Sequence, residues 1–157
     1  MTIRIGLGFD AHRFAEGRAL MLGTILVDHP SGLAGHSDGD VLTHAVVDAV
    51  LGAAGLGDIG THFPSSDARW VDADSVIFLS HAVAAATSAG YRVVNIDATV
   101  VCESPRIEPY REKIEAALTA AVGSGSVSVK ATTTDGMGFT GRGDGIAALA
   151  VALLESI

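Results

Sequence analysis

Cysteine, aromatic residues and basic residues are scarce in this chain of 157 residues. The one cysteine, Cys102, excludes a disulfide within the chain and favours a reducing compartment such as the cytoplasm. Lys and Arg number 10 against 18 Asp and Glu, which gives a formal net charge of −8. Because nucleic-acid binding requires clustered Lys and Arg, this charge argues against nucleic acid as a partner. Small phosphorylated ligands stay compatible with it, since bound cations and backbone N–H groups supply local positive potential.

Long uninterrupted apolar runs are also absent. No apolar stretch reaches membrane-spanning length without a glycine or polar interruption, so no membrane partner is expected. Residues 1–5 lead directly into a strand pattern without the features of a signal or transit segment, which again favours a cytoplasmic location. The hydrophobic content is nevertheless 48%. This is high for one domain of this length and indicates that part of the apolar surface is buried between subunits.

Apolar periodicity and turn residues predict a succession of strands and helices. Strands are expected at residues 3–9, 91–101 and 127–131, with a short hairpin formed by 19–22 and 24–27. Helices are expected at 40–54, at 75–89 after a cap at Asp74, and from Pro109 to near Gly123. For 146–154 the Ala and Leu content favours a helix, while the length fits a buried strand. The pattern predicts a single α+β domain spanning 1–157.

Aspartate and histidine gather near the N-terminus in a pattern typical of metal ligands. Asp10 and His12 follow the first expected strand, where residues two apart point to the same side. His44 lies in the first expected helix, and we expect Asp48, one turn away, to orient its imidazole. One carboxylate and two imidazoles leave a coordination position open, as in catalytic zinc sites. The facial triad of iron oxygenases has the same donors, but its usual all-β barrel does not fit three helices.

A second group of polar residues follows the expected strand at 127–131. Thr132–Thr134 and the glycines after them offer hydroxyl and backbone N–H groups that can approach an anion closely. Arg142 carries a planar guanidinium that fits phosphate, and Asp135 is a candidate ligand of a divalent cation. The segment therefore predicts a phosphate site, with a turn-rich surface loop as the alternative.

Three polar residues stand outside these two groups. Asp58 precedes a long loop, where it either accepts hydrogen bonds from substrate hydroxyls or only caps a turn. His29 and His81 have no other metal-binding residues near them in the sequence. We interpret both histidines as structural or solvated.

These motifs resemble those of the 2-C-methyl-D-erythritol 2,4-cyclodiphosphate synthase family, which belongs to the non-mevalonate isoprenoid pathway. The matching blocks occur in the family's order over nearly the whole chain and are Gly8–His12, Gly35–Asp40, His44, Gly57–Gly60 and Lys130–Gly145. The resemblance implies a mixed four-stranded sheet with helices packed on one face. It also implies a homotrimer with active sites between subunits, and a strand rather than a helix at 146–154.

The activity that the resemblance implies is the metal-dependent cyclisation of 4-diphosphocytidyl-2-C-methyl-D-erythritol 2-phosphate. The 2-phosphate oxygen attacks the β-phosphorus in line, CMP leaves, and 2-C-methyl-D-erythritol 2,4-cyclodiphosphate is formed. A phosphate nucleophile is already ionised at neutral pH, so the protein must mainly position the groups and neutralise charge. A non-catalytic isoprenoid- or nucleotide-binding module is the alternative, but it would have no use for an open metal position.

The resemblance also implies roles for individual residues. Asp10, His12 and His44 would bind zinc, and Asp135 magnesium or manganese. Catalytic roles are implied for His36, Ser37, Asp58, Lys130, Thr132 and Thr133. The residues implied to bind the cytidine diphosphate substrate are Asp10, His12, His36, Ser37, Asp58, Gly60, Cys102, Arg106, Ile107, Ala131, Thr132, Thr133, Asp135, Phe139 and Arg142. Two positions depart from the commoner family pattern: Asp135 replaces Glu, and Arg106 replaces Lys, which changes the geometry of the charge.

Overall fold

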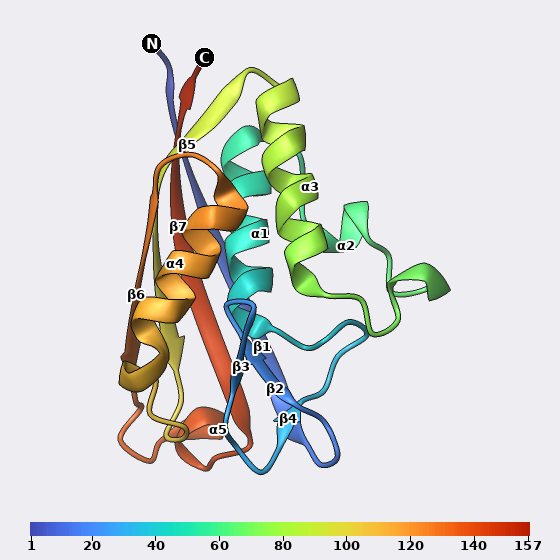
Figure 1. Cartoon of the computed structure of the whole chain (residues 1–157), viewed down its shortest axis with the longest axis vertical. Helices are drawn as coiled ribbons and strands as arrows, with labels where there is room; N and C mark the ends of the chain where they lie inside the picture. Colours follow the sequence, from blue (N-terminus) through green and yellow to red (C-terminus); the bar gives the residue numbers. More distant parts are fainter.

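The computed structural model describes all 157 residues, and its centre is a five-stranded mixed sheet (Figure 1). Its strands, in spatial order, are β4 (Gly32–Leu33), β1 (Ile3–Ala15), β7 (Gly145–Ser156), β5 (Tyr91–Val101) and β6 (Ser126–Thr132). β5 and β6 run parallel, and the other neighbours are antiparallel. The predicted α+β fold with a mixed sheet is confirmed, but the prediction of four strands is wrong. The fifth strand, β4, has only two residues and exists through its pairing with the end of β1.

The remaining elements largely match the sequence pattern. β2 (Leu20–Leu22) and β3 (Ile25–Val27) form the expected hairpin. The main helices are α1 (Val41–Ala54), α3 (Ser75–Ser88) and α4 (Arg111–Val122), and the short ones are α2 (Ile59–His62), α5 (Gly138–Gly141) and the 3-10 turns Ala68–Trp70 and Glu108–Tyr110. The ambiguous last segment is the strand β7. No helix of the chain is long and apolar enough to cross a membrane.

The two longest helices, α1 and α3, begin in different ways. At α1 the Asp40 carboxylate accepts the Thr43 N–H at 3.0 Å, as a capping aspartate should. It also accepts the Gly23 N–H at 2.9 Å, which ties the hairpin to the helix. At α3 Asp74 is the N-cap residue, as predicted, but its side chain makes no capping hydrogen bond. The Ser75 N–H instead donates at 2.9 Å to Asp38, a residue distant in sequence.

Helices α1, α3 and α4 cover one face of the sheet (Figure 1). On β1 the even-numbered positions are turned toward the helices, whereas Ile5, Leu7 and Phe9 are 68%, 66% and 55% exposed on the opposite face. Leu149 and Val151 of β7 pair with Phe9 and Leu7 and extend this exposed apolar face. A single chain thus leaves a large apolar surface on one side of its sheet.

Two glycines of β1 allow α1 to lie directly on the strand. A Cβ atom on Gly6 would lie 2.0 Å from the Ala49 carbonyl oxygen, and one on Gly8 would lie 1.8 Å from the Ala45 carbonyl oxygen. No side chain other than hydrogen fits there without moving the helix. Because His44 is adjacent to Ala45, this contact carries its imidazole to the end of β1 at which Asp10 and His12 lie.

We predict that Gly8→Ala lowers the free energy of unfolding by about 1–3 kcal/mol, because the added methyl group must displace the backbone of α1. Gly52→Ala is the matched control, since Gly52 lies on an exposed part of the same helix with no atom within 4 Å of an added Cβ. That change is expected to stabilise by about 0.5–1 kcal/mol. Urea unfolding of both variants checks the pair, and equal stabilities would contradict the close-packing argument.

Candidate active site

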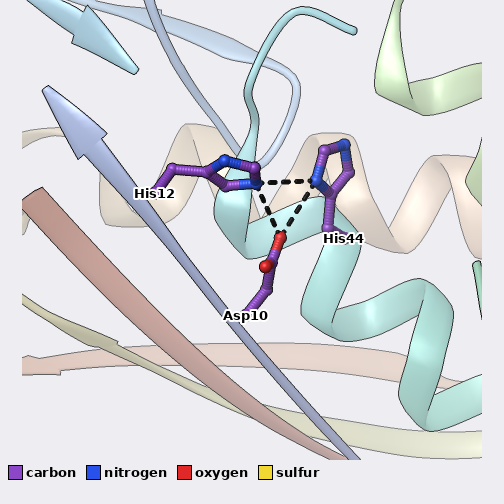
Figure 2. A group of neighbouring side chains, drawn as sticks. All are labelled: Asp10, His12 and His44. Atoms are coloured by element: carbon purple, nitrogen blue, oxygen red, sulfur yellow. Dashed lines mark hydrogen bonds and ion pairs between the residues drawn. The ribbon is translucent and has the colours of Figure 1, made fainter. Parts of the chain in front are cut away.

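Asp10, His12 and His44 converge on one point (Figure 2). Asp10 Oδ2 lies 2.8 Å from His12 Nε2 and 3.0 Å from His44 Nδ1, and the two nitrogens are 3.2 Å apart. Ligand atoms around a tetrahedral zinc ion, at bonds of 2.0–2.1 Å, are about 3.3 Å apart. The predicted metal-binding triad is therefore confirmed as a group of three donors that one ion can bridge.

The charges of the triad are mutually stabilising. Burial alone would raise the pKa of Asp10, but hydrogen bonds from His12 and His44 outweigh it and hold that pKa well below its usual range. Burial alone would lower the pKa of His12, but the Asp10 carboxylate outweighs it and raises that pKa above 6.5. Without a metal ion, a proton on His12 thus partly neutralises the carboxylate.

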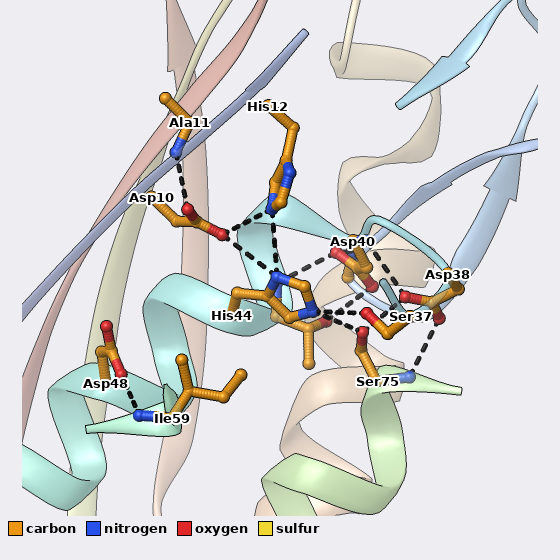
Figure 3. Close-up of polar contacts among 12 residues, drawn as sticks. Asp10, Ala11, His12, Ser37, Asp38, Asp40, His44, Asp48, Ile59 and Ser75 are labelled. Carbon is orange, nitrogen blue, oxygen red and sulfur yellow. Dashed lines mark hydrogen bonds and ion pairs between the residues drawn. The ribbon is translucent and has the colours of Figure 1, made fainter. Parts of the chain in front are cut away.

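The far side of the His44 imidazole contacts two serines (Figure 3). Nε2 lies 3.0 Å from Ser37 Oγ and 2.9 Å from Ser75 Oγ. The prediction that Asp48 orients this ring is wrong. The Asp48 carboxylate accepts the Ile59 N–H at 2.8 Å and so fixes the start of α2. Burial raises the pKa of Asp48.

A cavity of about 510 Å³ opens beside the triad. The residues of this cavity that the sequence predicted as site residues are Asp10, His12, His36, Ser37, His44 and Gly60. The sequence reasoning missed Phe63, Pro64, Ser65, Ser66, Trp70 and Phe78, which line the same cavity. Phe63–Ser66 follow α2 and carry no charged side chain, whereas Trp70 and Phe78 are apolar residues of the next turn and of α3, so none of them has the signature of a metal ligand. Phe63 and Phe78 rings lie 4.5 Å apart and form an apolar wall.

Asp58 does not line this cavity. Its Oδ1 accepts both the N–H and the hydroxyl of Thr61 at 2.8 Å and caps α2. These bonds lower the pKa of Asp58. The turn-capping alternative is therefore observed. His81, interpreted as isolated, is hydrogen-bonded to His62 with 3.1 Å between Nε2 and Nδ1.

A second cavity, of about 240 Å³, lies at the C-terminal ends of β5 and β6. The predicted site residues that line it are Cys102, Arg106, Ile107, Ala131, Thr132 and Thr133, and Glu103, Pro105 and Glu108 complete it. Glu103 accepts the Thr134 N–H at 3.2 Å and thereby joins the segment after β5 to the segment after β6. Burial raises the pKa of Cys102 to about 11, so its thiol stays protonated at neutral pH.

Besides Asp58, four predicted site residues lie outside both cavities. Lys130 Nζ pairs with Asp97 at 2.6 Å, and Arg142 pairs with Asp144 at 3.0 Å. Phe139 lines a third cavity, of about 620 Å³, together with His12 and Asp144. Asp135 has a φ of 51° in the turn after the threonines, and its Oδ1 lies 3.3 Å from Thr133 Oγ1.

The cavity beside Asp10, His12 and His44 (the triad cavity) and the cavity lined by Thr132 and Thr133 (the threonine cavity) share no lining residue. Across the sheet, Asp10 pairs with Ala148, Ala148 with Val100, and Val100 with Ala131. Asp10 and Ala131 are thus in one row, three strand spacings or about 14 Å apart. One chain therefore presents two separate polar sites at the same end of its sheet.

A model of the YgbB family matches residues 3–155. The chain belongs to the YgbB family. The 2-C-methyl-D-erythritol 2,4-cyclodiphosphate synthase of Geobacillus kaustophilus is 52% identical to this YgbB family member over 154 residues, covering 97% of this chain and 98% of the relative. The bifunctional enzyme IspD/IspF of Erythrobacter litoralis is 53% identical over 154 residues, but this chain spans only 40% of its length. The resemblance stated from the sequence is confirmed.

Solved structures agree with this YgbB family assignment. The IspF CDP complex from Plasmodium falciparum matches with a TM-score of 0.85 at 33% identity, covering 98% of this chain and 96% of that one. The bifunctional IspDF of Campylobacter jejuni matches with a TM-score of 0.95 at 38% identity, covering 99% of this chain and 43% of that one. The fold and the curated relatives thus lead to the same family.

We predict that metal uptake at the triad releases a proton at pH 6.5. The Asp10 carboxylate raises the pKa of His12 and so favours a proton on the metal-free imidazole, and only the neutral imidazole binds a metal. Asp10 is already ionised and contributes no proton. Affinity should fall as the pH is lowered, and proton release should fade above the raised pKa of His12. Zinc titration calorimetry in two buffers of different ionisation enthalpy checks this, and identical heats in both at pH 6.5 would contradict it.

Proposed function

We propose that this chain cyclises 4-diphosphocytidyl-2-C-methyl-D-erythritol 2-phosphate to 2-C-methyl-D-erythritol 2,4-cyclodiphosphate and releases CMP. The observation that carries the proposal is the open three-donor set of Asp10, His12 and His44 beside a cavity, in a member of a family with curated synthases of this name. The bond formed joins the 2-phosphate oxygen to the β-phosphorus, and the bond broken is that between the β-phosphorus and the CMP oxygen. The nucleophile is ionised at neutral pH, so no strong protein base is required.

Zinc is the metal proposed for the triad, since two imidazole nitrogens and one carboxylate oxygen are donors that it prefers. Bound there, it would neutralise charge on a phosphate oxygen and polarise the phosphorus. The protein supplies the fixed donor positions, and the wall of Phe63 and Phe78 restricts water on one side of the cavity. An iron oxygenase is not favoured, because the fold is an α+β sheet rather than an all-β barrel.

The residues around the triad are proposed to hold the methylerythritol phosphate part of the substrate. His36, Ser37 and Gly60 line the cavity, and Asp58 begins the short helix that carries Gly60. The Ser37 hydroxyl and the His36 ring are donors suited to a phosphate oxygen. Positioning of the 2-phosphate for in-line attack is the catalytic role proposed for them.

The threonine cavity is proposed to hold the cytidine diphosphate part. Thr132 and Thr133 offer hydroxyl groups to the phosphates, and the turn containing Cys102, Arg106 and Ile107 encloses the base. Asp135, with its contact to Thr133 Oγ1, is the proposed ligand of magnesium or manganese. Ala131, Phe139 and Arg142 stay proposed substrate contacts, and Lys130 a proposed catalytic residue, on the basis of the family resemblance.

A homotrimer is proposed because one chain keeps the two halves of the site about 14 Å apart and leaves an apolar sheet face exposed. If three chains pack through Ile5, Leu7 and Phe9 around a common axis, the triad of one chain can face the threonine cavity of its neighbour. Residues 1–157 are proposed to be one synthase domain, supported by a continuous core cluster of 35 buried residues. The unpaired Cys102 supports a cytoplasmic location.

The direct test is phosphorus NMR of the purified chain with the proposed substrate, zinc and magnesium. Resonances of the cyclic diphosphate and CMP are expected with wild type. His44→Ala should lower the rate at least about 100-fold, since loss of one of three metal donors removes charge stabilisation at the reacting phosphate. His29→Ala is the control, because His29 stacks on Phe14 outside both cavities.

Two outcomes would contradict the proposed function. Tight substrate binding without turnover would indicate a binding module. Release of CMP together with 2-C-methyl-D-erythritol 2,4-bisphosphate would indicate a hydrolase, in which water rather than the 2-phosphate attacks the β-phosphorus.

A further inference from the structure

The His44 imidazole has two hydroxyl neighbours for a single proton. Its Nδ1 faces Asp10 and His12, so in the metal-bound form this nitrogen carries a lone pair and the ring proton is on Nε2. The Nε2 atom lies 2.9 Å from Ser75 Oγ and 3.0 Å from Ser37 Oγ. Distance alone does not decide which serine accepts the N–H.

The surroundings of Ser75 decide it. The Ser75 hydroxyl donates its proton to Asp38 Oδ1, and the Ser75 N–H donates at 2.9 Å to Asp38 Oδ2. Ser75 Oγ therefore has lone pairs, but no proton, to offer His44. Because Ser75 is fully buried, an N–H from the ring is the natural partner for this oxygen.

The Asp38 carboxylate is itself fixed. Its Oδ1 also accepts the Asp40 N–H at 3.0 Å, and the Asp38 N–H donates at 3.1 Å to the Ala73 carbonyl oxygen. These bonds lock the segment before α1 to the segment before α3 (Figure 3). A carboxylate held in this way cannot easily turn away from Ser75.

Ser37 is placed differently. It lines the triad cavity, whereas Ser75 and Asp38 do not. Its hydroxyl makes one hydrogen-bond contact, to His44 Nε2. If the N–H of His44 goes to Ser75, the Ser37 hydroxyl proton has no acceptor within the protein and can be directed at an anion in the cavity.

We propose that Asp38 and Ser75 form a positioning pair that fixes the tautomer and orientation of the metal ligand His44. The pair thereby leaves the hydroxyl proton of Ser37 available to a phosphate oxygen of the ligand. The inference rests on metal binding at the triad, which is part of the proposed function. Its first half concerns the metal alone and can be measured without substrate.

The test is zinc affinity, measured by competition with a chromophoric chelator and with zinc as the only ligand. Ser75→Ala should weaken zinc binding about 10–100-fold, the usual range for loss of a hydrogen-bond partner behind a metal-binding histidine. Ser75→Thr keeps the hydroxyl and should restore most of the affinity. Ser80→Ala is the matched control on the same helix, since Ser80 Oγ only donates to the Val76 carbonyl oxygen.

Ser37→Ala separates the two serines. Its zinc affinity should stay within about threefold of wild type, because only a weak shared contact to His44 is lost. Its KM for the substrate should rise, because the hydroxyl proposed to contact a phosphate oxygen is missing. Wild-type zinc affinity in folded Ser75→Ala, or an equal loss in Ser37→Ala and Ser75→Ala, would overturn the proposal. If Ser75→Ala does not fold, Asp38→Asn replaces it, and wild-type zinc affinity in that variant would overturn the proposal equally.

The zinc measurements also separate this inference from the proposed function. If the chain shows this pattern of zinc affinities but produces no cyclic diphosphate, the positioning pair is supported and the proposed synthase activity is contradicted. A wild-type chain that binds no zinc through Asp10, His12 and His44 would overturn both.

Discussion

The contact between α1 and the glycines of β1 is the constraint on which the metal site depends. Gly6 and Gly8 are turned toward the helix, and by strand alternation the next two side chains on that face are Asp10 and His12. The backbone approach that the glycines permit therefore also sets how near His44 comes to those two ligands. The three metal-binding atoms are already within hydrogen-bond distance of one another. A metal ion can therefore replace the proton between Asp10 and a histidine with little rearrangement.

The sequence predicted the metal ligands but not what supports them. Asp10, His12 and His44 are encoded by local periodicity, because strand and helix repeats fix their directions. The hydrogen-bond partner of His44 is not encoded in this way. Ser75 reaches the ring only because α3 packs against α1, and no residue spacing in the sequence indicates this contact. Asp48 has the expected helical spacing, yet the Ile59 N–H of the following turn occupies its carboxylate. The spacing rule described the helix correctly and missed the competing partner.

The fold shows the same division. Composition left 146–154 ambiguous, and its place between β1 and β5 makes it the central strand despite its Ala content. The wall formed by Phe63 and Phe78 was not predicted, because apolar side chains carry no chemical signature until the fold places them beside a cavity. Position in the sheet also explains why Asp10 and Ala131 are at the same end yet too far apart to meet. This separation, with the exposed apolar face, makes a second chain part of the proposed site.

Subunit complementation tests this two-chain site most directly. One variant, His44→Ala, loses the metal half, and another, Ala131→Glu, places a carboxylate in the threonine cavity. In a trimer that contains both variants, one of the three interfaces combines an intact metal triad with an intact threonine cavity, and the other two do not. Random exchange gives about three quarters mixed trimers, each with one intact site, so the mixture should recover about a quarter of wild-type activity. A mixture that demonstrably exchanges subunits, yet stays as inactive as the separate variants, would contradict a site shared between chains.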